Sequence, residues 1–189
     1  MAESRDRWIK NPTGQLIIAA EDGDVKAVVR LIEKDPGLVN AAEPEFGWTA
    51  LHRAVQFGHT RLVRLLLKSG ANPGQRDHKR NTPLHNAATG HDYTLQSLEL
   101  LVKAGAPIES RNTYWETPIH VAVQHSNLPG FSFLLEQGAR TDWRDRQGLD
   151  ALGMAKYQAA NVHSSRKYDQ QRRELKAIIE MLEDLNSSK

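Results

Sequence analysis

The 189-residue chain contains no cysteine, which excludes disulfide bonds and thiolate metal sites. It has no apolar run near the roughly 20 residues that a membrane-spanning helix needs. Its first ten residues, Met1–Lys10, have no apolar core of the kind found in secretory signals. Together these absences predict a protein of the cytoplasm, or alternatively of the nucleus, that does not bind membranes.

The sequence also lacks an excess of either basic or acidic residues. The 25 basic and 23 acidic residues nearly cancel, which argues against a dedicated nucleic-acid binder. Only 6% of the residues are aromatic, so the few large rings stand out against the rest of the sequence.

Motifs that would indicate catalysis are absent as well. The sequence has no Gly-x-Ser-x-Gly elbow and no phosphate-cradling glycine loop, and no two histidines have zinc-site spacing with a third ligand nearby. Three aspartates cluster late in the chain but alternate with arginines, which predicts a solvated, self-paired loop rather than paired catalytic acids. These residues are Arg140, Asp142, Arg144, Asp145, Arg146 and Asp150. We therefore expect no metal, no cofactor and no enzymatic activity, and a non-standard His–Asp catalyst is the least favoured alternative.

What the sequence does contain is a repeat. The segments Thr49–His52, Thr82–His85 and Thr117–His120 read TALH, TPLH and TPIH, at spacings of 33 and 35 residues. A second motif, an apolar run that closes on Gly-Ala, follows each of them at a fixed offset. Its Gly-Ala pairs are Gly70-Ala71, Gly105-Ala106 and Gly138-Ala139.

Two motifs at one period resemble the ankyrin repeat family, from about Gly14 to Leu185. The resemblance implies an all-α solenoid of stacked helix-turn-helix hairpins with β-turn-like tips, in which stacking makes the core. We expect an N-terminal capping segment at 1–13, an array at 14–185 and a frayed end at 186–189. The approximate repeats are 14–46, 47–79, 80–114, 115–147 and 148–185.

Local chemistry supports the hairpins. Thr49, Thr82 and Thr117 stand where a helix N-cap is needed, and proline follows two of them at the first helical position. The histidine of each motif recurs at the repeat period, so we predict that it bridges backbone groups of adjacent turns and is not a metal ligand or general base.

Three further features depart from a uniform array. The third repeat is two residues longer, and the extra residues fall between its helices near Gly90–Gln96. The last helix carries an apolar stripe from Leu175 to Leu185 opposite a polar face, as a terminal cap requires. At the other end we expect Trp8 and Ile9 to fold over the first repeat.

The hairpin tips contain two unusual residues. Members of the family usually have glycine two residues before the threonine, and Gly47 and Gly148 keep it, but Arg80 and Trp115 replace it. A non-glycine residue at a position that needs positive φ costs roughly 1 kcal/mol or more. Such a cost is tolerated more readily where the side chain is used, so both residues are functional candidates.

The resemblance implies a concave groove, lined by the tips and first helices, as the usual binding face. Aromatic residues and arginine, the types enriched at interface hot spots, gather there. The predicted partner-binding residues are Phe46, Trp48, Arg53, Phe57, His78, Lys79, Arg80, Arg111, Tyr114, Trp115, Gln124, His125, Trp143, Arg144 and Arg146.

We predict a protein-binding scaffold or adaptor that takes an acidic or mixed-polarity segment of another protein. A small anionic or nucleotide-like ligand, held by aromatic stacking and arginine, is the alternative. The structural alternative is that Trp48 and Trp115 pack against the adjoining tip and that the arginines only solubilise the surface.

Overall fold

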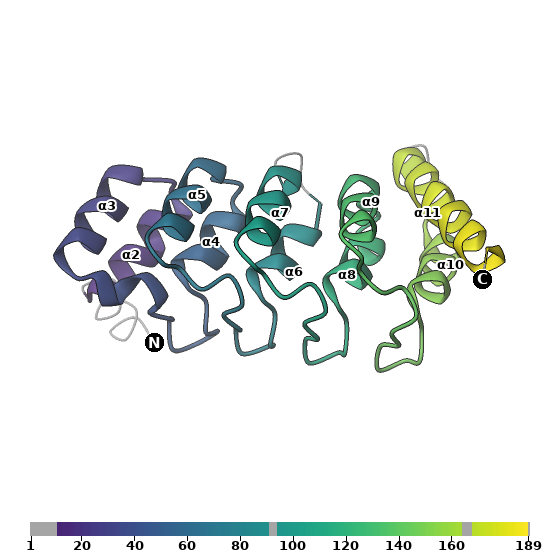
Figure 1. The fold of residues 1–189 in the computed structure, drawn as a ribbon, viewed down its shortest axis with the longest axis horizontal. Helices are drawn as coiled ribbons and strands as arrows, with labels where there is room; N and C mark the ends of the chain where they lie inside the picture. The colour runs from purple at the N-terminus through teal and green to yellow at the C-terminus, as the bar shows by residue number, and fades with distance from the viewer. Residues whose placement is uncertain (1–10, 91–93, 164–167, 189) are drawn as a thin grey trace. The chain divides into compact units, whose positions relative to one another are not determined.

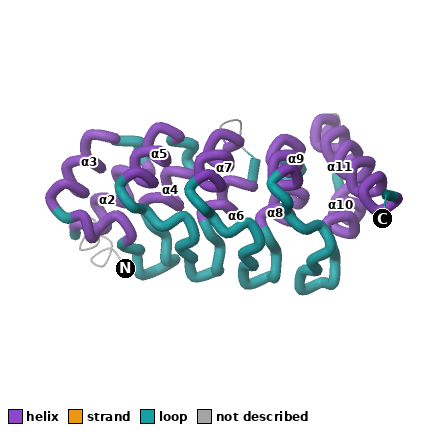
Figure 2. Tube along the Cα trace, in the orientation of Figure 1, coloured by secondary structure: helices purple, strands orange, loops and turns teal. Residues whose placement is uncertain are grey.

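The computed structural model describes residues 11–90, 94–163 and 168–188 (Figure 1). The all-α class predicted from the sequence is confirmed, and within these ranges β-type pairing is limited to an isolated bridge between Ala42 and Thr49. Helices come in consecutive antiparallel pairs, and long loops join one pair to the next (Figure 2). The elements are α2 (Pro12–Glu21), α3 (Val25–Lys34), η1 (Pro36–Asn40), α4 (Ala50–Gln56), α5 (Thr60–Lys68), α6 (Pro83–Ala88), α7 (Thr94–Lys103), α8 (Pro118–Gln124), α9 (Leu128–Glu136), α10 (Ala151–Asn161) and α11 (Asp169–Ser187).

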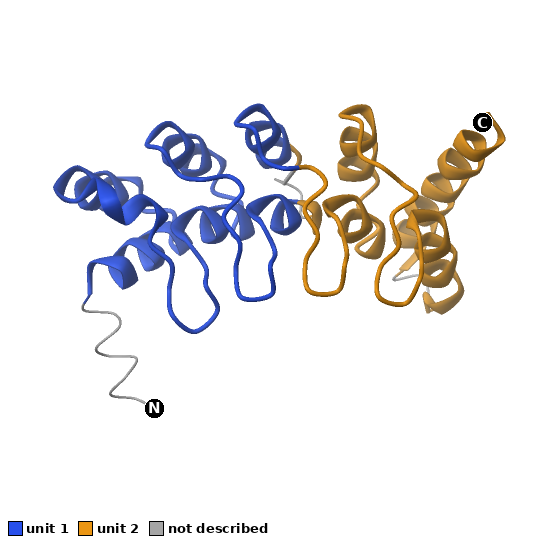
Figure 3. Cartoon of the chain, turned by 60° about the horizontal axis from the view of Figure 1, so that its bottom comes forward, with its two compact units in different colours: residues 1–87, 96–107 blue, residues 88–95, 108–189 orange. Residues whose placement is uncertain are grey.

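The chain divides into two compact units (Figure 3). Unit 1 comprises residues 1–87 and 96–107, and unit 2 comprises residues 88–95 and 108–189. None of the helices in the described ranges has the length and hydropathy that crossing a bilayer requires.

Unit 1 is built by stacking one hairpin on the next. Helix α2 packs against both its own partner α3 and the following first helix α4, which in turn packs against α5. Small residues on α4 allow the close approach, and the second helices supply bulk: Leu62 and Leu66 of α5 are fully buried.

Unit 2 repeats this pattern and adds a long final helix. Helix α8 packs against α9 and α10, and α11 lies against α10 and α9. Leu175, Ile178 and Leu182 of α11 are buried, whereas Leu185 is partly exposed. The predicted apolar stripe therefore covers the end of unit 2 with its polar face outward.

The threonine–histidine motif joins each first helix to the loop that follows. In α4 the Nδ1 atom of His52 accepts from the Thr49 backbone N–H (3.2 Å), which leaves the proton on Nε2 to donate to the Asn81 carbonyl (3.3 Å). In α8 the Nδ1 atom of His120 accepts from the Thr117 backbone N–H (3.3 Å), and its Nε2 donates to the Trp143 carbonyl (2.9 Å). The bridging role predicted for these two histidines is confirmed.

Burial also changes how these histidines titrate. Both rings are fully buried, and desolvation lowers the pKa of His52 and of His120 below the ordinary histidine value. Each imidazole is therefore held neutral, as the acceptor role of Nδ1 demands.

Some boundaries differ from the expected ones. Helix α2 begins at Pro12, where Asn11 caps it by accepting from the Gly14 N–H (2.7 Å), so the helical array starts before residue 14. Residues 186 and 187, where we expected a frayed end, belong to α11, which continues to Ser187. The hydroxyls of Ser187 and Ser188 bond carbonyls one turn back and extend the helical hydrogen bonding.

The remaining expectations concern connections. Residues 89–93 join α6 to α7, whereas 57–59 join α4 to α5, so the two extra residues of the third repeat lie between its helices as predicted. Trp8 and Ile9 lie outside the described residues.

Candidate functional site

Each hairpin tip is held by one buried acceptor from its own loop. Glu43, Asp77, Asn112 and Asp145 are all more than nine-tenths buried. Asp145 Oδ1, for example, accepts from the backbone N–H groups of Gln147 (2.8 Å) and Leu149 (2.9 Å). Because every tip has such an acceptor, the loops hold their shape without a partner.

This arrangement separates the charges at the tips. The oxygens of Asp77 and Asp145 point inward and are used by the loop backbone, whereas Lys79, Arg80 and Arg146 are exposed. The expectation of a solvated, self-paired loop holds for Asp142, which pairs with Arg140 (2.8 Å) in solvent, but not for Asp145, whose carboxylate is buried as a loop brace. The second and fourth tips therefore expose basic side chains, whereas the first tip exposes the acid Glu45.

The two unusual tip residues have the backbone conformation that glycine favours. Arg80 has a φ of 61° and Trp115 a φ of 64°, close to the 76° and 78° of Gly47 and Gly148 at the equivalent positions. The positive φ predicted from the sequence is confirmed. The Trp115 side chain is 52% exposed, so the strained backbone is not compensated by burial of the ring.

The tip surface of unit 1 consists of Phe46, Trp48, Arg53, His78, Lys79 and Arg80. Its centre is a stack in which the Phe46 and Trp48 ring centres lie 4.4 Å apart and the Arg53 guanidinium lies 3.8 Å from the centre of the Trp48 ring. Phe57 lies at the C-terminal end of α4, away from the tip, with its ring centre 5.8 Å from the Arg53 guanidinium. Arg53 is also tied to Glu21 (3.5 Å), so it is held as part of the stack. Phe46 and Phe57 remain exposed.

The second loop of unit 1 rests on the first. The His78 N–H donates to the Phe46 carbonyl (2.8 Å), and His78 Nδ1 bonds the Glu45 carbonyl (3.1 Å). His78 is therefore a link between tips, which leaves Lys79 and Arg80 as the unit's exposed basic pair.

The tip surface of unit 2 consists of Arg111, Tyr114, Trp115, Trp143, Arg144 and Arg146. Guanidinium groups and indole rings alternate in it, in the order Arg140, Trp143, Arg111 and Trp115, with charge-to-ring distances of 4.5, 4.9 and 5.1 Å. Arg111 also donates to the carbonyls of Trp115 (3.3 Å) and Arg144 (3.0 Å).

We call this alternating row of Arg140, Trp143, Arg111 and Trp115 the ladder. The predicted residues along it differ in exposure. Trp143 lies between two guanidinium groups and its Nε1 is buried, whereas Tyr114 and Trp115 at the end of the ladder are each about half exposed. Arg140 was not predicted from the sequence to be part of this tip surface. Its only sequence signal is its place directly after the Gly-Ala motif, one residue past Ala139.

Gln124 and His125 are not brought to the tips. They lie at the C-terminal end of α8, whereas the tip of that repeat precedes the N-terminal end of the same helix. There they line a pocket with residues of α11 that the sequence did not indicate. Ser126, the next residue, has a φ of 56°.

Neither tip surface offers a metal site. Across the described ranges, no three His, Asp or Glu side chains converge as metal ligands would. What the tips present is exposed aromatic surface beside exposed arginine and lysine on preformed loops, which suits recognition of another molecule.

Comparison with known protein families identifies the repeat. The family description "Ankyrin repeats (3 copies)" matches residues 16–112, and "Ankyrin repeat" matches residues 114–146. These matches cover well over half of the chain and contain both tip surfaces.

Curated relatives share the repeat region. A Transient receptor potential cation channel subfamily A member 1 homolog of Caenorhabditis elegans is 32% identical over 137 residues, which cover 72% of this chain and 11% of that protein. The 2-5A-dependent ribonuclease of Mus musculus is 43% identical over 77 residues, covering 41% and 10%. Target of rapamycin complex 2 subunit AVO2 of Saccharomyces cerevisiae is 24% identical over 194 residues, covering 82% and 46%. The chain therefore spans between about a tenth and a half of the length of these relatives.

Proposed function

Because this chain belongs to the ankyrin repeat family, whose repeats are generally protein-interaction modules, we propose that it is an adaptor. Its hairpin tips bind a segment of another protein. Each unit contributes its own tip surface, and the segment is acidic or of mixed polarity.

The observation that carries this proposal is the pair of strained tip residues. A left-handed backbone costs a residue with a β-carbon roughly 1–2 kcal/mol relative to glycine. Arg80 and Trp115 both adopt this conformation, at φ of 61° and 64°, and expose their side chains. Exposed side chains that destabilise the chain fit a role in binding better than a role in folding.

The charges favour an acidic or mixed partner. Lys79, Arg80 and Arg146 face outward, and Asp77 and Asp145 in the same loops are buried in loop hydrogen bonds. The exposed acids Glu45 and Asp142 make the partner's expected polarity mixed as well as acidic. Exposed aromatic rings beside these cations add the apolar contact that anchors interface hot spots. Phe46 supplies such a ring in unit 1, and Tyr114 and Trp115 supply it in unit 2.

The experiment uses a double variant, Arg80→Gly with Trp115→Gly, and the chain as affinity bait. Partners captured by the wild type are identified by mass spectrometry, and the affinity of the most enriched one is then measured by calorimetry. We expect the double variant to bind at least tenfold more weakly. Its thermal midpoint should stay the same or rise by a few degrees, because glycine relieves two strained positions.

A matched control replaces an exposed tyrosine and an exposed arginine away from the tips, Tyr157→Ala with Arg173→Ala. This variant should bind as the wild type does. Unchanged affinity in the glycine variant would contradict the assignment of the tips. Stabilisation by nucleotides, without any captured protein, would instead favour the small anionic ligand.

A further inference from the structure

The turn between α8 and α9 contains a residue that the rest of the repeat does not explain. Ser126 has a φ of 56°, and the corresponding turns of the preceding hairpins have Gly23, Gly58 and Gly90 at φ of 73–76°. A serine here carries the backbone cost of a β-carbon in the left-handed region. The equivalent glycines show that the fold itself does not require this side chain.

The Ser126 hydroxyl lacks a hydrogen-bond partner. The residue is only 2% exposed, and its Oγ atom is buried without any donor or acceptor in range. Leaving a buried hydroxyl unsatisfied costs roughly 1–3 kcal/mol. The backbone strain and the unpaired hydroxyl of Ser126 therefore both destabilise the folded chain when no ligand is bound.

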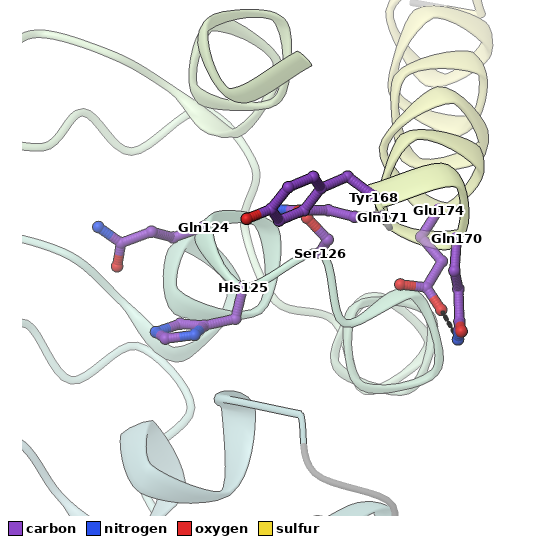
Figure 4. Close-up of a pocket in the computed structure, with 7 residues that line it drawn as sticks. All are labelled: Gln124, His125, Ser126, Tyr168, Gln170, Gln171 and Glu174. Carbon is purple, nitrogen blue, oxygen red and sulfur yellow. Dashed lines mark hydrogen bonds between the residues drawn. The ribbon is translucent and has the colours of Figure 1, made fainter. Parts of the chain in front are cut away.

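Ser126 lies in the wall of a polar pocket. The pocket has a volume of about 390 Å³ and lies between the end of α8 and the start of α11. The side chains of Tyr168, just before α11, and of Gln171 extend toward Ser126, and the Glu174 side chain lies beside Gln170 (Figure 4). The lining residues are Gln124, His125, Ser126, Tyr168, Gln170, Gln171 and Glu174.

The lining combines hydrogen-bonding groups with one negative charge. None of the lining residues that the structure describes is lysine or arginine, and Glu174 belongs to none of the ion pairs in the same part of the chain. One oxygen of Glu174 accepts from Gln170 Nε2 (3.1 Å), so the carboxylate is oriented while its other oxygen can accept from a ligand. Against these described side chains an anion would face the Glu174 carboxylate.

We propose that this pocket binds the guanidinium group of an arginine side chain from a bound peptide. A guanidinium has five N–H donors in one plane, which matches several acceptors spread around a pocket better than the single point of an ammonium does. The acceptors are the Glu174 carboxylate, the Gln171 amide oxygen and the Ser126 hydroxyl. The Tyr168 ring offers a face on which a planar cation stacks.

A peptide source fits better than free arginine. Free arginine carries an α-carboxylate, and no cation among the described lining residues would meet it. The side chain of a peptide reaches in without that second charge. This site is also independent of the tip surfaces, because α8 separates Ser126 from the tip of the same repeat.

The test is an NMR titration of the whole ¹⁵N-labelled chain with N-acetyl-arginine-amide. We expect saturable shifts at the amides of residues 125–127 and 168–174. The neutral isostere N-acetyl-citrulline-amide should cause none, and the lysine and free-arginine probes should bind at least threefold more weakly. Equal response to citrulline would overturn the cation site, and tighter binding of free arginine would overturn the peptide source.

Variants assign the binding to these side chains. Glu174→Gln keeps an oxygen for Gln170 but removes the charge, and Ser126→Gly removes the hydroxyl and the backbone strain. Each should weaken the arginine probe at least fivefold, and Ser126→Gly should unfold at the wild-type temperature or above it. Glu180→Gln makes the same charge change elsewhere on α11 and should bind normally. If Glu174→Gln bound the arginine probe as tightly as the wild type does, the proposed site would be wrong, and this outcome does not depend on whether the tips bind a partner.

Discussion

At the scale of single residues, three positions other than glycine have a positive φ within the described ranges. They are Arg80, Trp115 and Ser126. The first two were identifiable from the sequence, because glycine is expected at that point of the motif. Ser126 gave the same kind of signal, since it stands where Gly23, Gly58 and Gly90 stand in earlier hairpins, yet it becomes informative only when its hydroxyl is seen to be buried.

A pair of truncations separates core from binding residues. Leu66 is fully buried on α5, and Leu66→Ala should lower the free energy of unfolding by about 2–5 kcal/mol, as cavity-forming changes do. Trp115→Ala should cost less than about 1 kcal/mol, because it removes a half-exposed ring and one cation–π contact. Urea denaturation measures both. Similar losses would show that Trp115 is retained for stability.

The sequence identified the aromatic and basic residues of the tips but not how they are used. Arg53 and Arg111 were both predicted to contact a partner, yet Arg53 stacks on Trp48 and Arg111 bonds two carbonyls. The partner of Arg53 is 5 residues away in the chain and those of Arg111 are 4 and 33 residues away, and only the folded loops bring them into range. The exposure of Trp115 is likewise a product of the folded tip.

At the scale of the helix, most of the fold was predictable, because each hairpin repeats its own start and stop signals. The threonine motif starts α4, α6 and α8, and the Gly-Ala motif follows α5, α7 and α9. The last repeat has lost the threonine, but Asp150 takes its place and accepts from the Gly153 N–H (2.8 Å). The extent of α11 to Ser187 was not predictable, because serine hydroxyls, not an apolar pattern, extend it.

The Asp150 cap makes a quantitative prediction. Asp150→Ala removes the side chain that satisfies the first turn of α10, so it should lower the free energy of unfolding by about 0.5–2 kcal/mol. Glu180→Ala, on the exposed face of α11 beside Lys176 (3.7 Å), should cost no more than a few tenths of a kcal/mol. Chemical denaturation of the two variants in parallel checks this, and equal costs would argue against the cap.

At the scale of the whole molecule, the buried histidines link stability to pH. The pKa values of His52 and His120 are lowered in the folded chain, so below about pH 6.5 the unfolded chain binds more protons than the folded one. Stability should therefore be complete above that pH and fall as the pH drops toward the folded pKa values. The slope can reach about 1.4 kcal/mol per pH unit for each histidine.

Urea denaturation between pH 7.5 and 5 measures this slope. The variant His120→Gln should be less stable at pH 7.5, since it loses a bridge between Thr117 and Trp143, but its stability should decline less steeply with acidification. A flat profile for the wild type across this range would mean that both imidazoles accept protons without loss of structure.

The buried acceptor within each tip has a consequence for how this protein changes over time. Glu43, Asp77, Asn112 and Asp145 fix the loop frame from inside, and none of them faces outward. The apex of the frame holds glycine in two tips, arginine in another and tryptophan in another, with nearly the same backbone angle. If the tips bind as proposed, recognition and architecture are encoded by different residues of one short loop. A substitution at the apex would then change the partner and leave the buried loop frame unaltered.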